Sequence, residues 1–596
     1  MRQVILLCLA SIPFTVTARE LGNAQSPSNP NAPAYPPLTI PEEMPFRLPS
    51  LPPPASGDSQ RSPIARDLSV FVKTIRLEDA TVLTQAQAAV ITQPYENKLL
   101  DAADFQEIRV ALTQWYVSQG YVTSGVLLPD QQVTAGTIVF RAVEGELTRI
   151  EVTGRHTLRS RYVVGRLRRF IRKPLNVIEL QNALRYLQQD PNILRLDARL
   201  GAGEQPGQSV LRLQLEEQPR FSAGIETDNH RASSTGANLT SVLLSARDIA
   251  GFGEELLGSV GRSQGTNLGS ASLMVPVAAR NTSVQLYYAR SGADIIDSPF
   301  EALDITSRFE TRGIDSNIPL IEDLRNRFSL VAGFESNRST TYLLGQPFSF
   351  SPGAQNGRAA TSVGIAGIDW VEHGQTQALA LRLTYRHGFK WLNATVFAPQ
   401  TPQDLLENPT GADGRFNLER GQISYIQRLN ALPGLRWLHD RAQLELRGSA
   451  QMSQSPLMTL EKLAIGGVST VRGFPENLLV RDNGAAGTVE LQLPLPGYRP
   501  TPSLLNAVIV EFVDYGRSWD RRNTAPGSQV VDTTIPRFIA SAGLGALYQP
   551  CSGLDAQLYW GRGIANNFHG DDPRINRKND LQARGIHYAV SYTYKW

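Results

Sequence analysis

Apolar and polar residues alternate strictly over residues 588–596, the last nine of the chain. The broad apolar positions are Tyr588, Val590, Tyr592, Tyr594 and Trp596, and the positions between them are Ala589, Ser591, Thr593 and Lys595. Because amphipathic rings favour the boundary between lipid and water, one face of this predicted strand suits a membrane. A strand crosses lipid only when neighbouring strands satisfy its backbone in a closed sheet, so the pattern predicts the end of a transmembrane β-barrel.

The same alternation recurs throughout residues 219–596. Leu491 and Leu493, for example, alternate with Glu490 and Gln492. We therefore expect a barrel of sixteen antiparallel strands with polar side chains facing an aqueous lumen. A soluble β-sandwich shows the same two-residue period, but a signal-peptide pattern at the N-terminus and the aromatic C-terminus favour the barrel. The sixteen segments lie near residues 220, 239, 256, 271, 284, 304, 329, 364, 381, 423, 444, 490, 508, 539, 557 and 591.

The N-terminus has the pattern of a signal peptide, residues 1–18. Arg2 precedes an apolar run, and Val16 and Ala18 supply the small residues of a cleavage site. Residues 19–67 follow, with twelve prolines between residues 27 and 63. Prolines at this density predict an extended linker, with a docking segment as the alternative.

Two consecutive units with both helix-like and strand-like periods occupy residues 68–146 and 147–218. Each has a strand, helical segments and two closing strands, which predicts a repeat of two α/β domains. In the second unit, Asn176 and Glu179 predict a capping box at a helix start. In the first, four apolar residues share one face of a helix that Gly120 ends, namely Phe105, Ile108, Leu112 and Trp115.

Composition sets limits on the chemistry of this chain of 596 residues. The net charge of +3 leaves no footprint for nucleic acid, and the seven histidines show no metal-ligand spacing. Beyond the signal peptide there is no apolar run of about 18 residues, so no helical membrane span is expected. We expect no catalytic residues, no metal and no cofactor.

A long loop, residues 451–486, is expected between the eleventh and twelfth predicted strands. It contains Val471-Arg472-Gly473-Phe474, and the thirteenth strand carries Phe512, Asp514 and Gly516. An arginine fork inside a narrow channel needs an acceptor, and a carboxylate offers a bidentate partner. The adjacent Gly473 permits a tight turn. We therefore expect an Arg472–Asp514 pair that holds the loop inside the pore.

These motifs resemble those of the two-partner secretion transporters (TpsB type, the haemolysin and filamentous-haemagglutinin secretion family). That family belongs to the superfamily that joins POTRA domains to a sixteen-stranded barrel. Its sixth extracellular loop carries a V-R-G-[FY] tip, whose arginine pairs with the aspartate of an F-x-D motif. The first α/β unit also resembles a POTRA domain of this family, through Tyr116, Gly120, Tyr121, Val122, Leu128, Pro129 and Gln131, followed by Val143-Glu144-Gly145. The resemblance covers residues 68–596.

The resemblance implies an outer-membrane transporter of a Gram-negative bacterium with its POTRA domains in the periplasm. The partner would be a large exoprotein, captured unfolded by the POTRA domains and exported through the pore. An adhesin, a haemolysin or another exoprotein remain open as the client. Outer-membrane lipid and the barrel assembly machinery that recognises the C-terminal strand would be further partners. The alternative function is a factor that inserts other barrels, although such relatives carry more than two POTRA domains.

Two positions depart from the family pattern. The proline-rich segment 19–67 cannot form the long plug helix that several members carry. Glu511 falls on the face opposite Phe512 and Asp514, which predicts either a β-bulge or a position near the barrel rim.

Overall fold

The computed structural model describes residues 69–155, 157–278, 281–298, 300–399, 401, 408, 410–499, 503–521, 537–567 and 580–596. The predicted signal peptide and proline-rich linker lie outside these residues. The described chain forms two compact units. One contains residues up to Gln218 together with Asp248–Gly253, and the other contains Pro219–Arg247 and Glu254–Trp596. Among the described residues, no helix has the length and apolar character required to cross a membrane.

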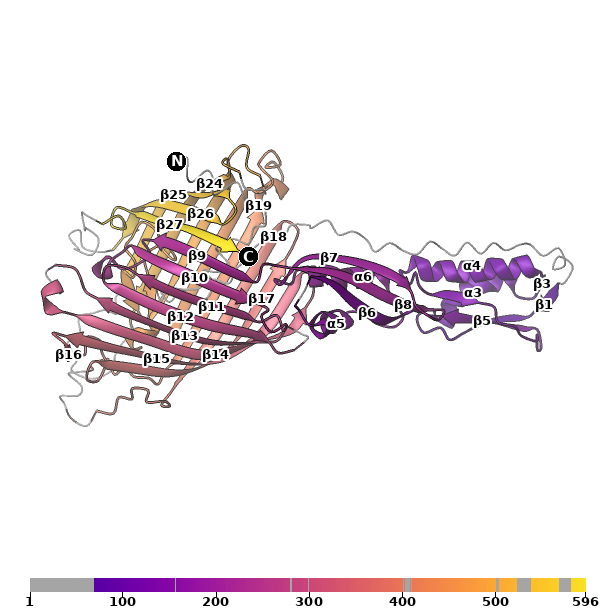
Figure 1. The fold of residues 1–596 in the computed structure, drawn as a ribbon, viewed down its shortest axis with the longest axis horizontal. Helices are drawn as coiled ribbons and strands as arrows, with labels where there is room; N and C mark the ends of the chain where they lie inside the picture. Colours follow the sequence, from indigo (N-terminus) through magenta and orange to yellow (C-terminus); the bar gives the residue numbers. More distant parts are fainter. Residues whose placement is uncertain are drawn as a thin grey trace. The chain divides into compact units, whose positions relative to one another are not determined.

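The first α/β domain packs two helices on a small sheet (Figure 1). Helix α4 begins where the Asp101 side chain accepts hydrogen bonds from the backbone of Ala103 and Asp104, and it ends before Gly120, whose φ is +88°. Ile108 and Leu112 of α4 are completely buried in the domain core. The elements are β1 (Val70–Val72), β2 (Thr74–Glu78), α3 (Gln85–Thr92), the 3₁₀ helix η2 (Gln93–Tyr95), β3 (Lys98–Leu100), α4 (Ala102–Ser118), β4 (Gly125–Leu127) and β5 (Thr137–Val143).

The second α/β domain repeats this sheet topology. Its elements are β6 (Glu146–Arg155), α5 (Ser160–Arg168), α6 (Val177–Gln188), β7 (Ile193–Ala202) and β8 (Gln208–Glu217). In the first domain the sheet order is β2-β5-β4, and in the second it is β6-β8-β7. In both, the central strand is parallel to the first and antiparallel to the other edge strand. Strand β6 already begins at Glu146, one residue before the expected domain boundary.

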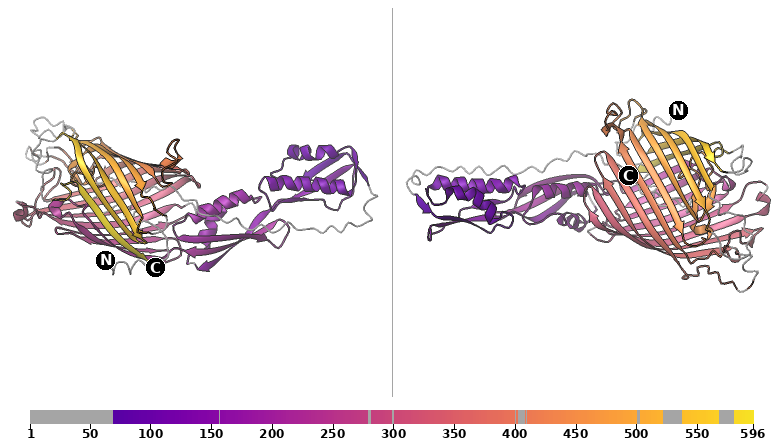
Figure 2. Two further views of the ribbon diagram at one scale, coloured as in Figure 1. Left: turned by 90° about the horizontal axis from the view of Figure 1, so that it is seen from above. Right: turned by 180° about the vertical axis from the view of Figure 1, so that it is seen from behind.

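The larger unit is a closed antiparallel barrel of sixteen long strands, and the predicted count is confirmed (Figure 1). The last strand pairs with the first, with Tyr592 opposite Ile225, so the barrel sheet has no free edge. The strands run obliquely around the barrel (Figure 2). They are β9 (Phe221–Asp228), β10 (Leu239–Arg247), β11 (Glu255–Arg262), β12 (Thr266–Pro276), β13 (Ser283–Asp294), β14 (Thr306–Glu322), β15 (Asn326–Leu343), β17 (Arg358–His373), β18 (Gln377–Phe389), β19 (Asn417–Arg428), β20 (Gln443–Ser453), β23 (Asn483–Pro494), β24 (Ala507–Trp519), β25 (Arg537–Cys551), β26 (Leu554–Asn566) and β27 (Ile586–Lys595).

Short elements accompany these strands. Strand β16 (Gln346–Pro347) adds a two-residue pairing to β15, while β21 (Leu463–Ile465) and β22 (Leu479–Arg481) form a separate hairpin between β20 and β23. The other short helices are η3 (Ser233–Thr235), η4 (Phe300–Leu303), η5 (Leu429–Ala431) and η6 (Thr459–Glu461).

The two faces of the barrel wall have the polarity expected of a membrane protein. On β23, Glu490 and Gln492 are buried inside, whereas Val489 is half exposed on the outer face. On β27, His587 and Ser591 are buried and Val590 and Tyr594 are exposed, as is Trp596 directly after the strand. The ring of Trp596 stacks on Phe221 of the first strand, so aromatic side chains continue across the closure of the barrel.

Candidate functional site

The candidate site is the sixth extracellular loop, residues 454–482, which folds inward between β20 and β23. Its hairpin β21–β22 and its tip have an apolar core of their own, which includes Ile465, Val471 and Phe474. Ala486 of β23 and Ile539 of β25 belong to the same buried cluster. The loop is therefore packed against the inner face of the barrel wall.

Arg472 at the tip of this loop is buried, with 1% of its surface exposed. Its Nε donates to Oδ2 of Asp514 at 2.9 Å, and its Nη2 donates to Oδ1 of the same carboxylate at 2.9 Å. The Arg472 backbone N–H also donates to Asp514 Oδ2 at 2.9 Å. The remaining guanidinium nitrogen, Nη1, donates to Oε2 of Glu490 at 2.6 Å. One loop residue is thus joined to two neighbouring strands by a bidentate contact and a second charge-assisted hydrogen bond.

The surroundings of Arg472 compensate its burial. The guanidinium carbon lies 3.7 Å from the ring centre of Phe512 and 4.9 Å from that of Tyr559, within cation–π distance. Arg447 of β20 approaches Glu490 at 3.3 Å and supplies a second positive charge. A buried ion pair adds little to stability against an apolar replacement, but removal of one partner costs about 3–5 kcal/mol. The arrangement therefore selects one loop position.

Glycines allow the loop tip to approach the wall. Gly473 has a φ of +86°, and a Cβ there would lie 2.7 Å from the carbonyl carbon of Gly561 on β26. The ring of Phe474 occupies the space beside Gly563, where a Cβ would lie 2.8 Å from it. Gly516 on β24 similarly leaves room for Val471. All seven residues expected at this site, Val471, Arg472, Gly473, Phe474, Phe512, Asp514 and Gly516, lie in this one region. The sequence motifs did not predict five further residues that contact the loop tip, although the glycine alternation on β26 is visible in the sequence. These residues are Glu490, Tyr559, Gly561, Gly563 and His587.

A second group of polar contacts holds the base of the loop. Glu461, at the end of η6, is 1% exposed. Its Oε1 accepts hydrogen bonds from Asn337 of β15 at 3.1 Å and from Thr361 of β17 at 2.9 Å. Its Oε2 lies 3.4 Å from Nη2 of Arg386 on β18. Since Arg386 also pairs with Glu335 at 2.8 Å, the loop base is joined to a different arc of the wall from the tip.

The POTRA signature residues divide into buried and accessible ones. Tyr116 is completely buried and donates to Glu144 at 3.0 Å, so its burial excludes direct contact with a client. Gly120 is also buried, and Tyr121 and Val122 are half-buried. Leu128 is exposed, and Pro129 and Gln131 are half-buried beside a pocket of about 370 Å³. The Gln131 amide exchanges hydrogen bonds with the backbone of Val139, both at 2.8 Å. Of the seven expected client-binding residues, Tyr116 and Gly120 are buried, and the other five keep accessible surface.

The Glu144 carboxylate ties the loop before α3 to the end of β5. Burial raises its pKa, but hydrogen bonds from the Thr81 hydroxyl, from the backbone N–H groups of Thr81 and Val82 and from Tyr116 outweigh burial and lower it. The stability this carboxylate contributes is present above its unfolded-state pKa and is lost as the pH falls through the lowered value.

Gly120 joins the two α/β domains. Its carbonyl accepts a hydrogen bond from Val177 N at 2.9 Å, and Asn176 Nδ2 donates to the Gln119 carbonyl at 2.9 Å. Asn176 also caps α6 by accepting from Ile178 N. The capping box expected here is wrong, because no return bond from Glu179 is formed within the described residues and the Asn176 amide turns to the first domain.

We expect Gly120→Val to loosen this joint. Its φ of +88° strains a β-branched residue by roughly 1–3 kcal/mol, and the new Cβ would lie 2.9 Å from Asn176 Oδ1. Limited proteolysis of the intact protein should then cut the segment 118–124 faster. Gly201→Val on β7 is the matched control, because the nearest atom to its Cβ is Arg212 Nη1 at 3.6 Å. Equal cleavage of the two variants would contradict the assigned role.

The fold and the site define a class of protein: an outer-membrane β-barrel with periplasmic POTRA domains and an inward-folded sixth loop. The family model for the haemolysin secretion/activation protein ShlB/FhaC/HecB matches residues 207–546, more than half of the chain. The model for the ShlB-type POTRA domain matches residues 70–145. The chain therefore belongs to the ShlB/FhaC/HecB family of two-partner secretion transporters.

Individual relatives are distant but match over most of their length. The outer membrane transporter CdiB of Dickeya dadantii (strain 3937) is 23% identical over 465 residues, 76% of each chain. The heme/hemopexin transporter protein HuxB of Haemophilus influenzae (strain 86-028NP) is 20% identical over 474 residues, 77% of each chain.

Solved structures share the fold. CdiB from Escherichia coli superposes with a TM-score of 0.61 at 18% identity, covering 91% of this chain and 92% of that chain. BamA from Haemophilus ducreyi lacking POTRA domains 1–3 gives a TM-score of 0.52 at 14% identity, covering 88% of this chain and 100% of that chain.

Proposed function

We propose that the protein captures one large exoprotein, still unfolded, in the periplasm and exports it through the barrel to the cell surface. The observation that carries this proposal is the inward sixth loop, which Arg472 holds against the wall through Asp514 and Glu490. A loop held by a few buried polar contacts can move without unfolding the barrel, because the closed sheet satisfies the backbone independently.

Strand edges in the POTRA domains support capture of an extended client segment. β4 and the ten-residue β7 lie at the edges of their sheets, so each can offer backbone hydrogen bonds to an added strand. Leu127 and Leu128, beside the β4 edge, are 48% and 38% exposed and provide apolar contacts. Leu128, Pro129 and Gln131 are the client-contact residues of this proposal.

We place the first POTRA domain at 68–146 and the second at 147–218.

The proposed partners of the barrel itself are lipid and the assembly machinery. Outer-membrane lipid would cover the exposed aromatic face of β27, and the barrel assembly machinery would recognise the same terminal strand, including Tyr594 and Trp596, during insertion.

The function is tested by a secretion assay with a candidate client, a large exoprotein carrying an N-terminal secretion domain. We expect the client outside the cell when this protein is present and in the periplasm when it is deleted, as measured by immunoblotting of medium, surface and periplasm. Equal export in both strains would overturn the proposal. A fall in the amounts of unrelated outer-membrane barrels on deletion would instead indicate an assembly factor.

A further inference from the structure

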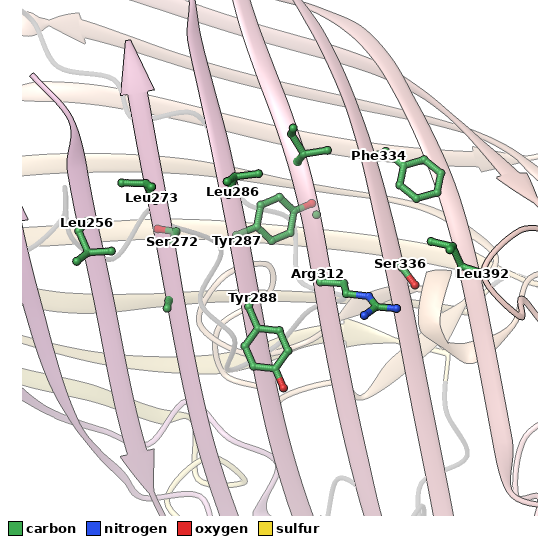
Figure 3. A pocket seen from close by; sticks show the side chains of 13 residues that line it. Leu256, Ser272, Leu273, Leu286, Tyr287, Tyr288, Arg312, Phe334, Ser336 and Leu392 are labelled. Carbon is green, nitrogen blue, oxygen red and sulfur yellow. The ribbon is translucent and has the colours of Figure 1, made fainter. Parts of the chain in front are cut away.

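An apolar row crosses the outer face of the barrel from β11 to β15. Strand register aligns Leu256, Leu273, Leu286, Ile314 and Phe334, one from each strand. Together with Leu392, which follows β18, these residues line a pocket of about 540 Å³ (Figure 3). The inward neighbour of Leu286 is Tyr287, whose hydroxyl donates to the buried Glu335 at 2.9 Å, so the row itself faces outward.

The next row on the same face is polar. Tyr288 lies opposite Arg312, which lies opposite Ser336. Figure 3 shows the Arg312 guanidinium beside Ser336, between Tyr288 and Leu392. Strand β13 begins at Ser283 on the periplasmic side of the barrel. Tyr288 comes two residues after Leu286, so its row lies nearer the extracellular side than the apolar row.

The following two rows carry four further arginines. Arg290, Glu310 and Arg338 are aligned in one row, and the alignment of the next row includes Arg262 and Arg308. We call these six charged residues the arginine face: Arg262, Arg290, Arg308, Glu310, Arg312 and Arg338. The arginine face thus contains five arginines and one glutamate. The next acidic residue, Asp294, lies one row nearer the extracellular side.

The arginines of this face are poorly compensated within the protein. In the part of the chain that the structure describes, Arg290, Arg312 and Arg338 form no ion pair or side-chain hydrogen bond with other residues. Arg308 lies over the Tyr342 ring at 5.7 Å. An arginine on the lipid side of a barrel costs roughly 2–4 kcal/mol at the bilayer midplane and less near the interface. A cluster of arginines on this side would therefore be stabilised by an anionic partner.

We propose that the arginine face and the apolar row bind lipid A, the phosphorylated and multiply acylated glycolipid of the outer leaflet. Guanidinium groups such as those of Arg290 and Arg312 pair with phosphate oxygens through two parallel hydrogen bonds. Acyl chains lie along Leu286, Ile314 and Phe334, while Tyr288 occupies the boundary between headgroup and chains. This site does not depend on the export function, because it lies on the outer surface and involves no client.

The test is the binding of diphosphoryl lipid A to the purified full-length protein in detergent, measured by native mass spectrometry. Arg290→Gln/Arg312→Gln should weaken binding at least about tenfold, because two charge-assisted contacts to phosphate are lost. The matched control is Arg517→Gln/Arg562→Gln, which removes two exposed arginines from the outer faces of β24 and β26. It should leave lipid A affinity unchanged.

Two outcomes would overturn the proposal. One is equal lipid A affinity in the two double variants. The other is wild-type protein that binds phosphatidylglycerol as tightly as lipid A and loses both to the same extent, which would indicate a general anionic surface. Misfolding is checked by the heat-dependent gel mobility of the barrel. Since neutralising lipid-facing arginines lowers the cost of insertion, the test variant is expected to fold.

Discussion

Export of the client should fall at least about tenfold in an Arg472→Ala variant whose barrel is still inserted, because removing one partner of a buried ion pair costs about 3–5 kcal/mol. Asp514 and Glu490, both completely buried, would lose the guanidinium that pairs with them. The free energy that favours the docked position of the loop over other positions would therefore decrease. Client in the medium is measured by immunoblotting, and loop release by trypsin cleavage on intact cells.

The matched control for this variant is Arg382→Ala on β18. Arg382 makes an equally bidentate contact to Asp369, at 2.7 and 2.8 Å, but both residues belong to the wall. Its loss should leave export near the wild-type level. Asp514→Asn should reproduce the Arg472 defect, and combining the two should add little, because residues of one network are not independent. Normal export from Arg472→Ala, or an equal defect in Arg382→Ala, would contradict the anchoring role.

The barrel was predictable because its physical signal is local and repeated. Each strand alternates on its own, as Val489 and Glu490 do, and sixteen repetitions reinforce the interpretation. The Arg472–Asp514 contact also followed from short motifs, since a buried guanidinium needs a carboxylate. The bulge expected near Glu511 is wrong. β24 is in regular register with both neighbours, and Glu511 is exposed four residues after the strand begins, which fits the rim position.

Other features lacked a local signal or carried one that was overlooked. Helix α3 is rich in alanine and glutamine and has a weak apolar face, but its capping box, Thr84 with Gln87, is visible in the sequence. The POTRA signature identified the domain without separating contact residues from packing residues, because burial of Tyr116 depends on the whole domain core. Tertiary structure alone shows that Gly120 faces the second domain.

Glu461 could not be predicted, because its partners are remote in sequence. Asn337 and Thr361 lie 124 and 100 residues away, and Arg386 lies 75 residues away. No motif connects them. Glu461 at the base of the sixth loop and Arg472 at its tip therefore anchor the loop to separate arcs of the wall. Because two separate points are held, both the position of the loop and its orientation in the lumen are defined.

We therefore expect Glu461→Ala to reduce export strongly while Arg472 stays docked. The change removes the Glu461 acceptor of Thr361 and one of the two acceptors of Asn337, which still donates to Glu335. It also leaves Arg386 with Glu335 as its remaining close carboxylate, and each buried group left unsatisfied costs about 1–3 kcal/mol. Immunoblotting of secreted client measures export, and trypsin should cut near Lys462 before it cuts near the tip.

Glu461→Gln is the informative companion, since its amide oxygen still accepts from Asn337 and Thr361 while the charge facing Arg386 is lost. An intermediate export level in this variant would assign part of the anchor to hydrogen bonding and part to charge. Asp369→Asn is the matched control, because Asp369 lies on β17 and its carboxylate accepts hydrogen bonds from Arg382 of the neighbouring strand β18. If the base anchor positions the loop, Asp369→Asn should export normally, whereas an equal loss in Glu461→Gln and Asp369→Asn would mean that the charge of the barrel wall, rather than loop attachment, governs export.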